Sequence, residues 1–218
     1  MAISRQQSDF AQPPADALDA VPVKGPRART QRLMLQTATE LMQHGHTPSV
    51  NEVAEEAGVS RATAYRYFPS QLALVQSVVN EVLGPITNWE PAAEDAEERL
   101  TDLLTHSLPL IDEFEATFRA ALKIYLEQWA NRKHDANGTA EEFKRGHRLK
   151  MLNDAVSPLK GSLGDEELER LVGGLSALFG IETIVVLKDI NGMDSRQTRN
   201  TIIWAAKSLV RQAIMENQ

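Results

Sequence analysis

The sequence contains no cysteine among its 218 residues. This absence excludes disulfide bonds, thiolate metal sites and cysteine nucleophiles, and with them the disulfide-rich secreted proteins. No apolar run reaches the ~18 residues that a membrane-spanning helix needs. The first twenty residues have neither a basic start nor an apolar core, so they do not resemble a signal peptide. We therefore expect a cytoplasmic protein that does not contact a membrane.

An overall positive charge is also absent, but the charge is unevenly distributed. The formal net charge is −7. Residues 24–80 nevertheless hold six lysines and arginines against four acids, whereas residues 81–218 hold 16 basic and 23 acidic residues. Because a phosphate backbone attracts cations and repels anions, only the segment 24–80 is suited to a nucleic acid.

The motifs of common enzyme classes are missing as well. The sequence has no glycine-rich phosphate loop, no His-Glu-x-x-His and no nucleophile elbow. His44 and His46 flank Gly45, but no carboxylate stands near them at ligand spacing, which favours a loop between helices over a metal site. We expect no catalytic residue, no metal and no cofactor. An enzyme and a purely architectural or protein-binding helical domain are the alternatives to a nucleic-acid-binding protein.

Helical periodicity is present along most of the chain, so the sequence predicts an all-α fold. Residues 1–26 are polar and contain prolines, which predicts a disordered arm. From about Arg27 the apolar residues recur at helical spacing until Gly45. Ile184 to Leu187 is the one stretch that could be interpreted as a strand. Beyond residue 68, helices are expected over about 70–83, 93–107, 110–132, 139–157, 165–190 and 194–216, separated by glycines and prolines that include Gly84-Pro85 and Pro109.

Residues 49–68 predict two short helices joined by a tight turn. Ser49-Val50-Asn51-Glu52 has the form of a capping box, which begins a helix. Gly58 provides the left-handed backbone that the turn requires. Ser60 can cap the second helix, which ends before Pro69.

The packing of these two helices is also indicated by residue type. The small Ala54 lets the helices cross closely, and Val59 provides an apolar contact after the turn. Ala64 and Phe68, four residues apart, point back toward the first helix. The opposite face of the second helix then carries Arg61, Thr63, Tyr65, Arg66 and Tyr67. Arginine can bind guanine edges or phosphates, while threonine and tyrosine hydroxyls can bind bases or phosphates, and a helix ~12 Å long fits one major groove.

The stretch Val59-Ser60-Arg61-Ala62-Thr63-Ala64-Tyr65-Arg66-Tyr67-Phe68-Pro69-Ser70 resembles the signature of the tetracycline-repressor (TetR) family of bacterial regulators. The residues from Thr37 to Met42, followed by Gly45, resemble the first helix of that family. The resemblance covers about residues 27–80. It implies a helix-turn-helix DNA-binding domain over 27–83, of which the helix 70–83 connects to a helical ligand-binding and dimerisation domain over 84–218.

The function that this resemblance implies is regulation of transcription by a homodimer on double-stranded DNA. A small-molecule effector, not identified by the sequence, would release a repressor from a palindromic operator; activation is the alternative. By position, Thr63, Tyr65 and Tyr67 match the DNA-contacting residues of the family, and Ser49 and Val50 match a helix start that approaches the DNA backbone. The full set expected at DNA is Ser49, Val50, Ser60, Arg61, Thr63, Tyr65, Arg66 and Tyr67.

The sequence departs from the family pattern at two positions. Ala64 replaces a commonly larger apolar residue, so the packing there is looser or is completed by Phe68. Gln71 replaces a lysine that commonly contacts a phosphate. We therefore expect a weaker hold on the phosphate at this helix start, although its backbone amides could still bind.

The C-terminal half carries two further hypotheses, and core packing is the alternative to each. An effector pocket with apolar walls and few polar groups is expected among the helices from 93 to 157. Its candidate residues are His106, Phe114, Phe118, Tyr125, Trp129, Phe143 and His147. The resemblance implies that the last two helices pair with their copies as a four-helix bundle. The candidate dimer residues are Leu175, Phe179, Ile203, Leu209 and Val210.

Overall fold

Helices form nearly all of the part of the chain that the computed structural model describes, residues 25–132 and 146–217. Within these ranges there is no β-strand beyond one isolated bridge between Lys160 and Leu163, so the predicted all-α class is confirmed. The helices are α1 (Pro26–Gln43), α2 (Val50–Glu56), α3 (Arg61–Tyr67), α4 (Gln71–Thr87), α5 (Ala96–Glu113), α6 (Glu115–Arg132), α7 (His147–Ala155), α8 (Asp165–Leu178), α9 (Ile181–Val185) and α10 (Ser195–Met215).

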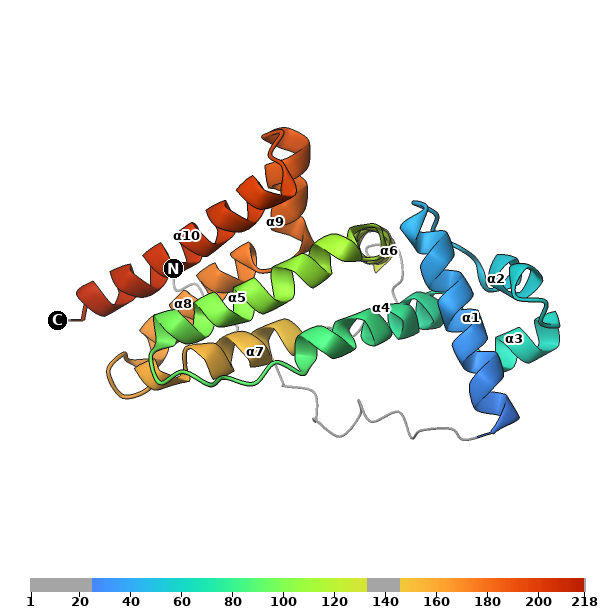
Figure 1. The fold of residues 1–218 in the computed structure, drawn as a ribbon, viewed down its shortest axis with the longest axis horizontal. Coiled ribbons are helices and arrows are strands. Elements are labelled where there is room, and N and C mark those ends of the chain that lie inside the picture. Colours follow the sequence, from blue (N-terminus) through green and yellow to red (C-terminus); the bar gives the residue numbers. More distant parts are fainter. Residues whose placement is uncertain (1–24, 133–145, 218) are drawn as a thin grey trace, which may run out of the picture.

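Figure 1 shows α1, α2 and α3 gathered at one end of the molecule, with α4 running from them into a larger body built from α5 to α10. α6 packs against both α1 and α4, and α10 packs against α5 and α8. The buried side chains of both parts form one contiguous cluster. The helices near the N-terminus are therefore joined to the larger body through packed surfaces as well as through the chain.

Two glycines end the first two helices as the sequence predicted. Gly45 and Gly58 have φ angles of 83° and 65°, in the left-handed region. After α2, the amide of Val59 donates to the carbonyl of Ala54 at 2.8 Å, and the amide of Gly58 donates to that of Glu55 at 3.2 Å. This pair of bonds is a Schellman motif, which satisfies the last carbonyls of the helix and fixes the direction of the turn.

The core beneath α2 and α3 is formed by small and apolar side chains. Ala54, Ala64 and Phe68 are almost completely buried, which confirms the two predicted contact faces. Phe68 is the largest of these three side chains. Leu74 and Val75 extend the same core along α4.

Two proline positions were predicted wrongly as helix ends. α4 continues through Pro85 to Thr87, and α5 continues through Pro109 to Glu113. Each proline removes one backbone hydrogen bond, to the carbonyl four residues earlier. Pro85 and Pro109 are both exposed, as are Glu81 and Thr105, which carry those carbonyls, so water can reach the places where the bonds are missing.

The predicted helix over 165–190 is interrupted in the structure. α8 ends at Leu178, Phe179 and Gly180 leave the helical conformation, and α9 is followed by a π-helical segment, Val186–Ile190. The strand alternative for residues 184–187 is therefore wrong. Of the predicted helix 139–157, only the part from residue 146 onward lies within the described residues, and α7 begins at His147.

No single helix in the described ranges is long and apolar enough to cross a membrane. α8 and the stretch Ile181–Ile190, bent by 49° relative to each other, meet the criterion of length and composition only as a pair.

Candidate nucleic-acid interface and cavity

The start of α2 is fixed by the predicted capping box. The amide of Ser49 donates to the Glu52 carboxylate at 2.7 Å, and the amide of Glu52 donates to the Ser49 hydroxyl at 3.2 Å. The hydrogen bonds from the backbone and the side chain of Ser49 hold the pKa of Glu52 below its ordinary value. The Val50 side chain is buried in the core, so only its backbone can face DNA.

α3 is capped by Ser60 and presents its polar face outward. The amide of Thr63 donates to the Ser60 hydroxyl at 3.3 Å, and this hydroxyl lies 2.9 Å from the hydroxyl of Thr63. Arg61 and Arg66 are exposed, and Tyr65 is 45% exposed although it is a large aromatic residue. The face that would be buried in a purely architectural domain is thus open to solvent.

Tyr67 differs from its neighbours because it is half-buried. Its ring lies 6.4 Å from that of Phe68 between centroids, and it packs against the core. The guanidinium carbon of Arg66 lies 5.5 Å from the Tyr67 ring centroid, within the range of a cation–π contact. The structure therefore restricts the orientation of Arg66 while leaving its guanidinium exposed.

Gln71, at the position where the family commonly has lysine, is used within the fold. Its amide nitrogen donates to the carbonyls of Thr47 and Pro48 at 2.9 and 3.1 Å. These bonds tie the start of α4 to the segment that precedes α2. Glutamine is uncharged, and its amide nitrogen is engaged by these two bonds. Gln71 therefore does not offer a phosphate the positive charge that a lysine would bring.

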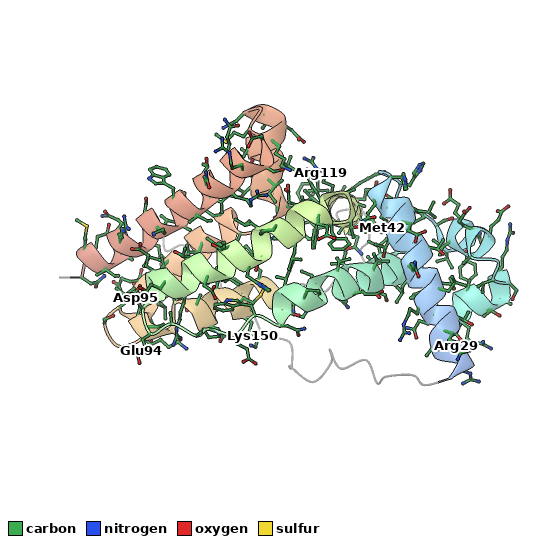
Figure 2. All side chains as sticks on the ribbon, viewed as in Figure 1. Arg29, Met42, Glu94, Asp95, Arg119 and Lys150 are labelled. Atoms are coloured by element: carbon green, nitrogen blue, oxygen red, sulfur yellow. The ribbon has the colours of Figure 1, made fainter. Side chains whose placement is uncertain are left out.

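Exposed cations also lie on α1. Arg27, Arg29 and Arg32 are exposed, and Figure 2 shows Arg29 near the N-terminal end of α1, at the same end of the molecule as α3. Together with Arg61 and Arg66, they form a set of solvent-accessible guanidinium groups that can bind phosphates or guanine edges.

A cavity of about 310 Å³ lies among α4, α5, α6, α7 and the α8–α9 break. Most of its lining is aliphatic or aromatic, and three of these side chains, Val79, Leu83 and Ile86, come from α4. Because α4 begins next to α3, the cavity and the helix-turn-helix share one helix. The volume is at the lower end of the range of small-molecule sites.

The predicted pocket residues lie in different places. Phe118 and His147 line the cavity. His106 is exposed, and its Nε2 lies 2.9 Å from the Pro85 carbonyl, outside the lining. Three further candidates also lie outside the lining: Phe114 packs against the core where α5 ends, Tyr125 is half-buried and Trp129 is 54% exposed. Phe143 is not among the described residues.

Sequence reasoning missed the residues that give the cavity its polar side. Arg148 donates from Nη1 to the Ser176 carbonyl at 3.1 Å and from Nη2 to the Glu182 carboxylate at 2.8 Å. Gly180 lies against this pair, because a Cβ there would be 2.1 Å from Nη2 of Arg148. Gly180 inside a long apolar pattern was the one signal of a break, and nothing in the sequence pointed to Arg148.

The predicted dimer residues are also divided. Leu175, Phe179 and Val210 are buried in the core of the chain itself, and Phe179 lines the cavity. Ile203 is half-buried, and Leu209 is 37% exposed. The large apolar side chains that are most exposed in this region are others, namely Ile190 (76%), Trp204 (70%) and Met215 (68%).

Charged groups cluster where α5, α6 and the π-helical segment meet. Arg119, labelled in Figure 2, pairs with Asp189 at 2.7 and 2.8 Å and with Glu115 at 2.7 Å. Its hydrogen bonds to Asp189 are the main cause of its raised pKa. Lys188 pairs with Asp112 and Glu115. These ion pairs hold the π-helical segment after α9 against α5 and α6. Within the described ranges, no group of three or more His, Asp or Glu residues has the arrangement of a metal site.

Comparison with known proteins supports the interpretation of α1 to α4. Residues 34–78 match the family model of the bacterial regulatory proteins of the tetR family. No curated protein sequence gives a significant match.

Solved structures resemble the fold over most of the chain. A tetR-family transcriptional regulator from Streptomyces coelicolor has a TM-score of 0.61 and 17% identity, covering 86% of this chain and 83% of that one. A TetR transcriptional regulator from Rhodococcus sp. RHA1 has a TM-score of 0.53 and 19% identity, covering 85% and 97%. Residues 34–78 thus match the model of the tetR family of bacterial regulatory proteins, and the fold over most of the chain resembles that of solved TetR-family transcriptional regulators.

Proposed function

We propose that this protein is a sequence-specific transcriptional repressor that binds a palindromic operator through the outward face of α3. The observation that carries the proposal is the exposure of Arg61, Tyr65 and Arg66 on a helix whose other side is buried. An amphipathic helix of this length, capped and held by a tight turn, fits the major groove, where arginine distinguishes guanine from other bases.

The proposed operator-bound form is a homodimer. One short recognition helix contacts too few base pairs to specify a site, whereas two helices in successive major grooves read a palindrome. Trp204 and Met215 are both exposed and stand eleven residues, about three turns, apart on α10, so they lie on the same side of the helix and support an interface there. Exposed Gly173 and Ala177 on α8 would let a partner helix approach closely.

The cavity is the proposed effector site. A molecule in it touches Val79, Leu83 and Ile86, so it acts directly on α4, the helix that follows α3 in the chain and packs against α1. α6 also borders the cavity and packs against α1. An effector that fits one position of α4 better than another would favour a different separation of the two α3 helices of the dimer. The size of this shift is limited by the difference in the effector's affinity for the two states.

The proposal is tested by selecting DNA from a genomic library with the purified protein at two salt concentrations. We expect enrichment of a palindrome, weaker at the higher salt and lost in the double variant Arg61→Ala/Tyr65→Ala. Lys160→Ala, which removes an exposed cation far along the chain from α3, is the matched control and should retain the enrichment. Enrichment that survives the double variant would overturn the role of α3.

A further inference from the structure

The cavity has a polar side that is distinct from its apolar walls. The walls are formed by α4, Ile111, Phe118, Leu122 and Phe179. Among the described lining residues, the charged groups are Arg148 and Glu182, which bind each other, and His147 is next to Arg148 in the chain. A ligand that fits such a site is apolar over most of its length and polar at one end.

The size of the cavity limits the ligand. Its volume of about 310 Å³ is roughly twice the ~150 Å³ that accommodates benzene in an engineered cavity. The ligand is therefore expected to have on the order of 10 to 15 non-hydrogen atoms. This size leaves room for one polar group and a short aliphatic or aromatic body.

The guanidinium of Arg148 is fixed, but only part of it is used. It is anchored by the Ser176 carbonyl and lies against Gly180, whose missing side chain makes room for it. The two hydrogen bonds, to Ser176 and Glu182, use two of its five N–H donors. The planar fork of arginine binds a carboxylate through two parallel hydrogen bonds, which gives both affinity and orientation.

Glu182 is the partner that can leave this ion pair. The two side chains are similarly exposed, 34% for Arg148 and 37% for Glu182, so exposure does not separate them. The difference is the anchor: Arg148 keeps its hydrogen bond to the Ser176 carbonyl of α8, whereas the Glu182 carboxylate can turn toward water. A ligand cation would instead displace the anchored Arg148 or lie next to a fixed like charge. From this difference, we infer that the cavity takes a small, largely apolar carboxylic acid, whose carboxylate replaces Glu182 on the guanidinium of Arg148.

This inference rests on the proposed function, in which a small molecule in the cavity controls DNA binding, and it names the chemical class of that molecule. It also gives Glu182 a role. In the empty protein its carboxylate occupies the place of the ligand's carboxylate and keeps Arg148 paired, and binding releases it.

The test is calorimetric titration of the full-length protein without DNA at pH 7.5, with decanoate, 1-decanol and decylammonium below micelle-forming concentrations. We expect decanoate to bind about tenfold to a hundredfold more tightly than 1-decanol, the range of a charge-assisted hydrogen bond. Arg148→Met should lower decanoate affinity to that of 1-decanol and leave 1-decanol binding unchanged, which also shows that the variant cavity is intact. Glu182→Gln should raise decanoate affinity, because the competing anion is gone.

Three results would overturn the inference: no binding of decanoate, tightest binding of decylammonium, or a preference for decanoate that survives Arg148→Met. Gly180→Ala is a further check, since its Cβ would displace the guanidinium and should reduce decanoate affinity more than that of 1-decanol. A failure of the proposed function would give a different result from a failure of this inference. Decanoate that binds as expected but leaves the DNA complex intact would contradict the effector mechanism and not the chemistry of the cavity.

Discussion

At the scale of single residues, the helix-turn-helix depends on one backbone conformation. Gly58 has a φ of 65° and joins α2 to α3 through the Schellman motif. A side chain at this φ costs about 1–2 kcal/mol, since its Cβ approaches the carbonyl oxygen. We expect Gly58→Ala to lower the free energy of unfolding by about that amount, measured by urea denaturation. Gly58→Asn should cost less, because asparagine adopts the left-handed conformation more readily, and equal losses in the two variants would contradict this explanation.

Gln71 offers a second test at this scale, because it makes hydrogen bonds within the fold at a position where the family commonly has a lysine that contacts a phosphate. Gln71→Lys places a cation where the family commonly has one and should strengthen DNA binding. The slope of log affinity against log salt should become steeper by about 0.9, the contribution of one neutralised phosphate. Asn80→Lys, at an exposed position nine residues further along α4, is the control and should not change the slope. Equal slopes for both variants would show that the start of α4 does not meet a phosphate.

Local residue chemistry explains why this part of the molecule could be predicted from the sequence. The capping box at Ser49, the turn at Gly58 and the buried pair Ala64 and Phe68 all depend on neighbours within a few residues. The cavity could not be predicted in the same way. Arg148 and Glu182 meet only because α7 packs against the α8–α9 break, and that contact is set by tertiary structure.

At the scale of helices, tertiary packing outweighs local signals. Pro85 and Pro109 were expected to end α4 and α5, yet the buried neighbours Ile86 and Ile111 keep both helices in register with the core. A proline costs a helix one hydrogen bond on its exposed side, whereas ending the helix there would remove a buried apolar side chain from the core. The sequence pattern indicates the hydrogen bond that is lost at a proline, but it does not indicate the burial of the side chains that follow it.

α5 and α10 are joined by an ion pair whose strength depends on pH. Glu97 accepts hydrogen bonds from Arg211 at 2.7 Å and is 3.0 Å from Lys207, and these contacts lower its pKa from 4.5 to about 2. Because the pKa in the folded state lies below the ordinary value, the stabilisation is fully present above pH 4.5 and is lost as the pH falls toward 2.

We therefore expect Glu97→Gln to lower the melting temperature at pH 7, and the difference from the wild type to shrink progressively as the pH falls below 4.5. Thermal unfolding measured from pH 7 to pH 3 checks this. Glu98→Gln, in the same first turn of α5, controls for loss of negative charge at the helix start. A difference that stays constant over the whole pH range would contradict the assigned role of the ion pair.

At the scale of the whole molecule, the proposed dimer can be separated from the stability of one chain. Trp204 is 70% exposed on α10, so Trp204→Glu should leave the helical content unchanged while a partner chain could no longer pack there. Sedimentation should show a dimer for the wild type and a monomer for this variant. Trp129→Glu, at a tryptophan that is 54% exposed on α6, should remain dimeric. If Trp204→Glu remained dimeric and Trp129→Glu became monomeric, the interface would lie at α6 and not at α10.

The central claim is that α3 reads a DNA sequence. The measurement that tests it most directly is the ratio of the dissociation constants for a scrambled duplex and for the enriched palindrome of equal length, at one fixed salt concentration. We predict a ratio of at least about 10³ for the wild type, falling by tenfold or more in Arg61→Ala/Tyr65→Ala, because losing base contacts removes specificity while the other phosphate contacts persist. A wild-type ratio near one, or a ratio unchanged in the variant, would contradict the account.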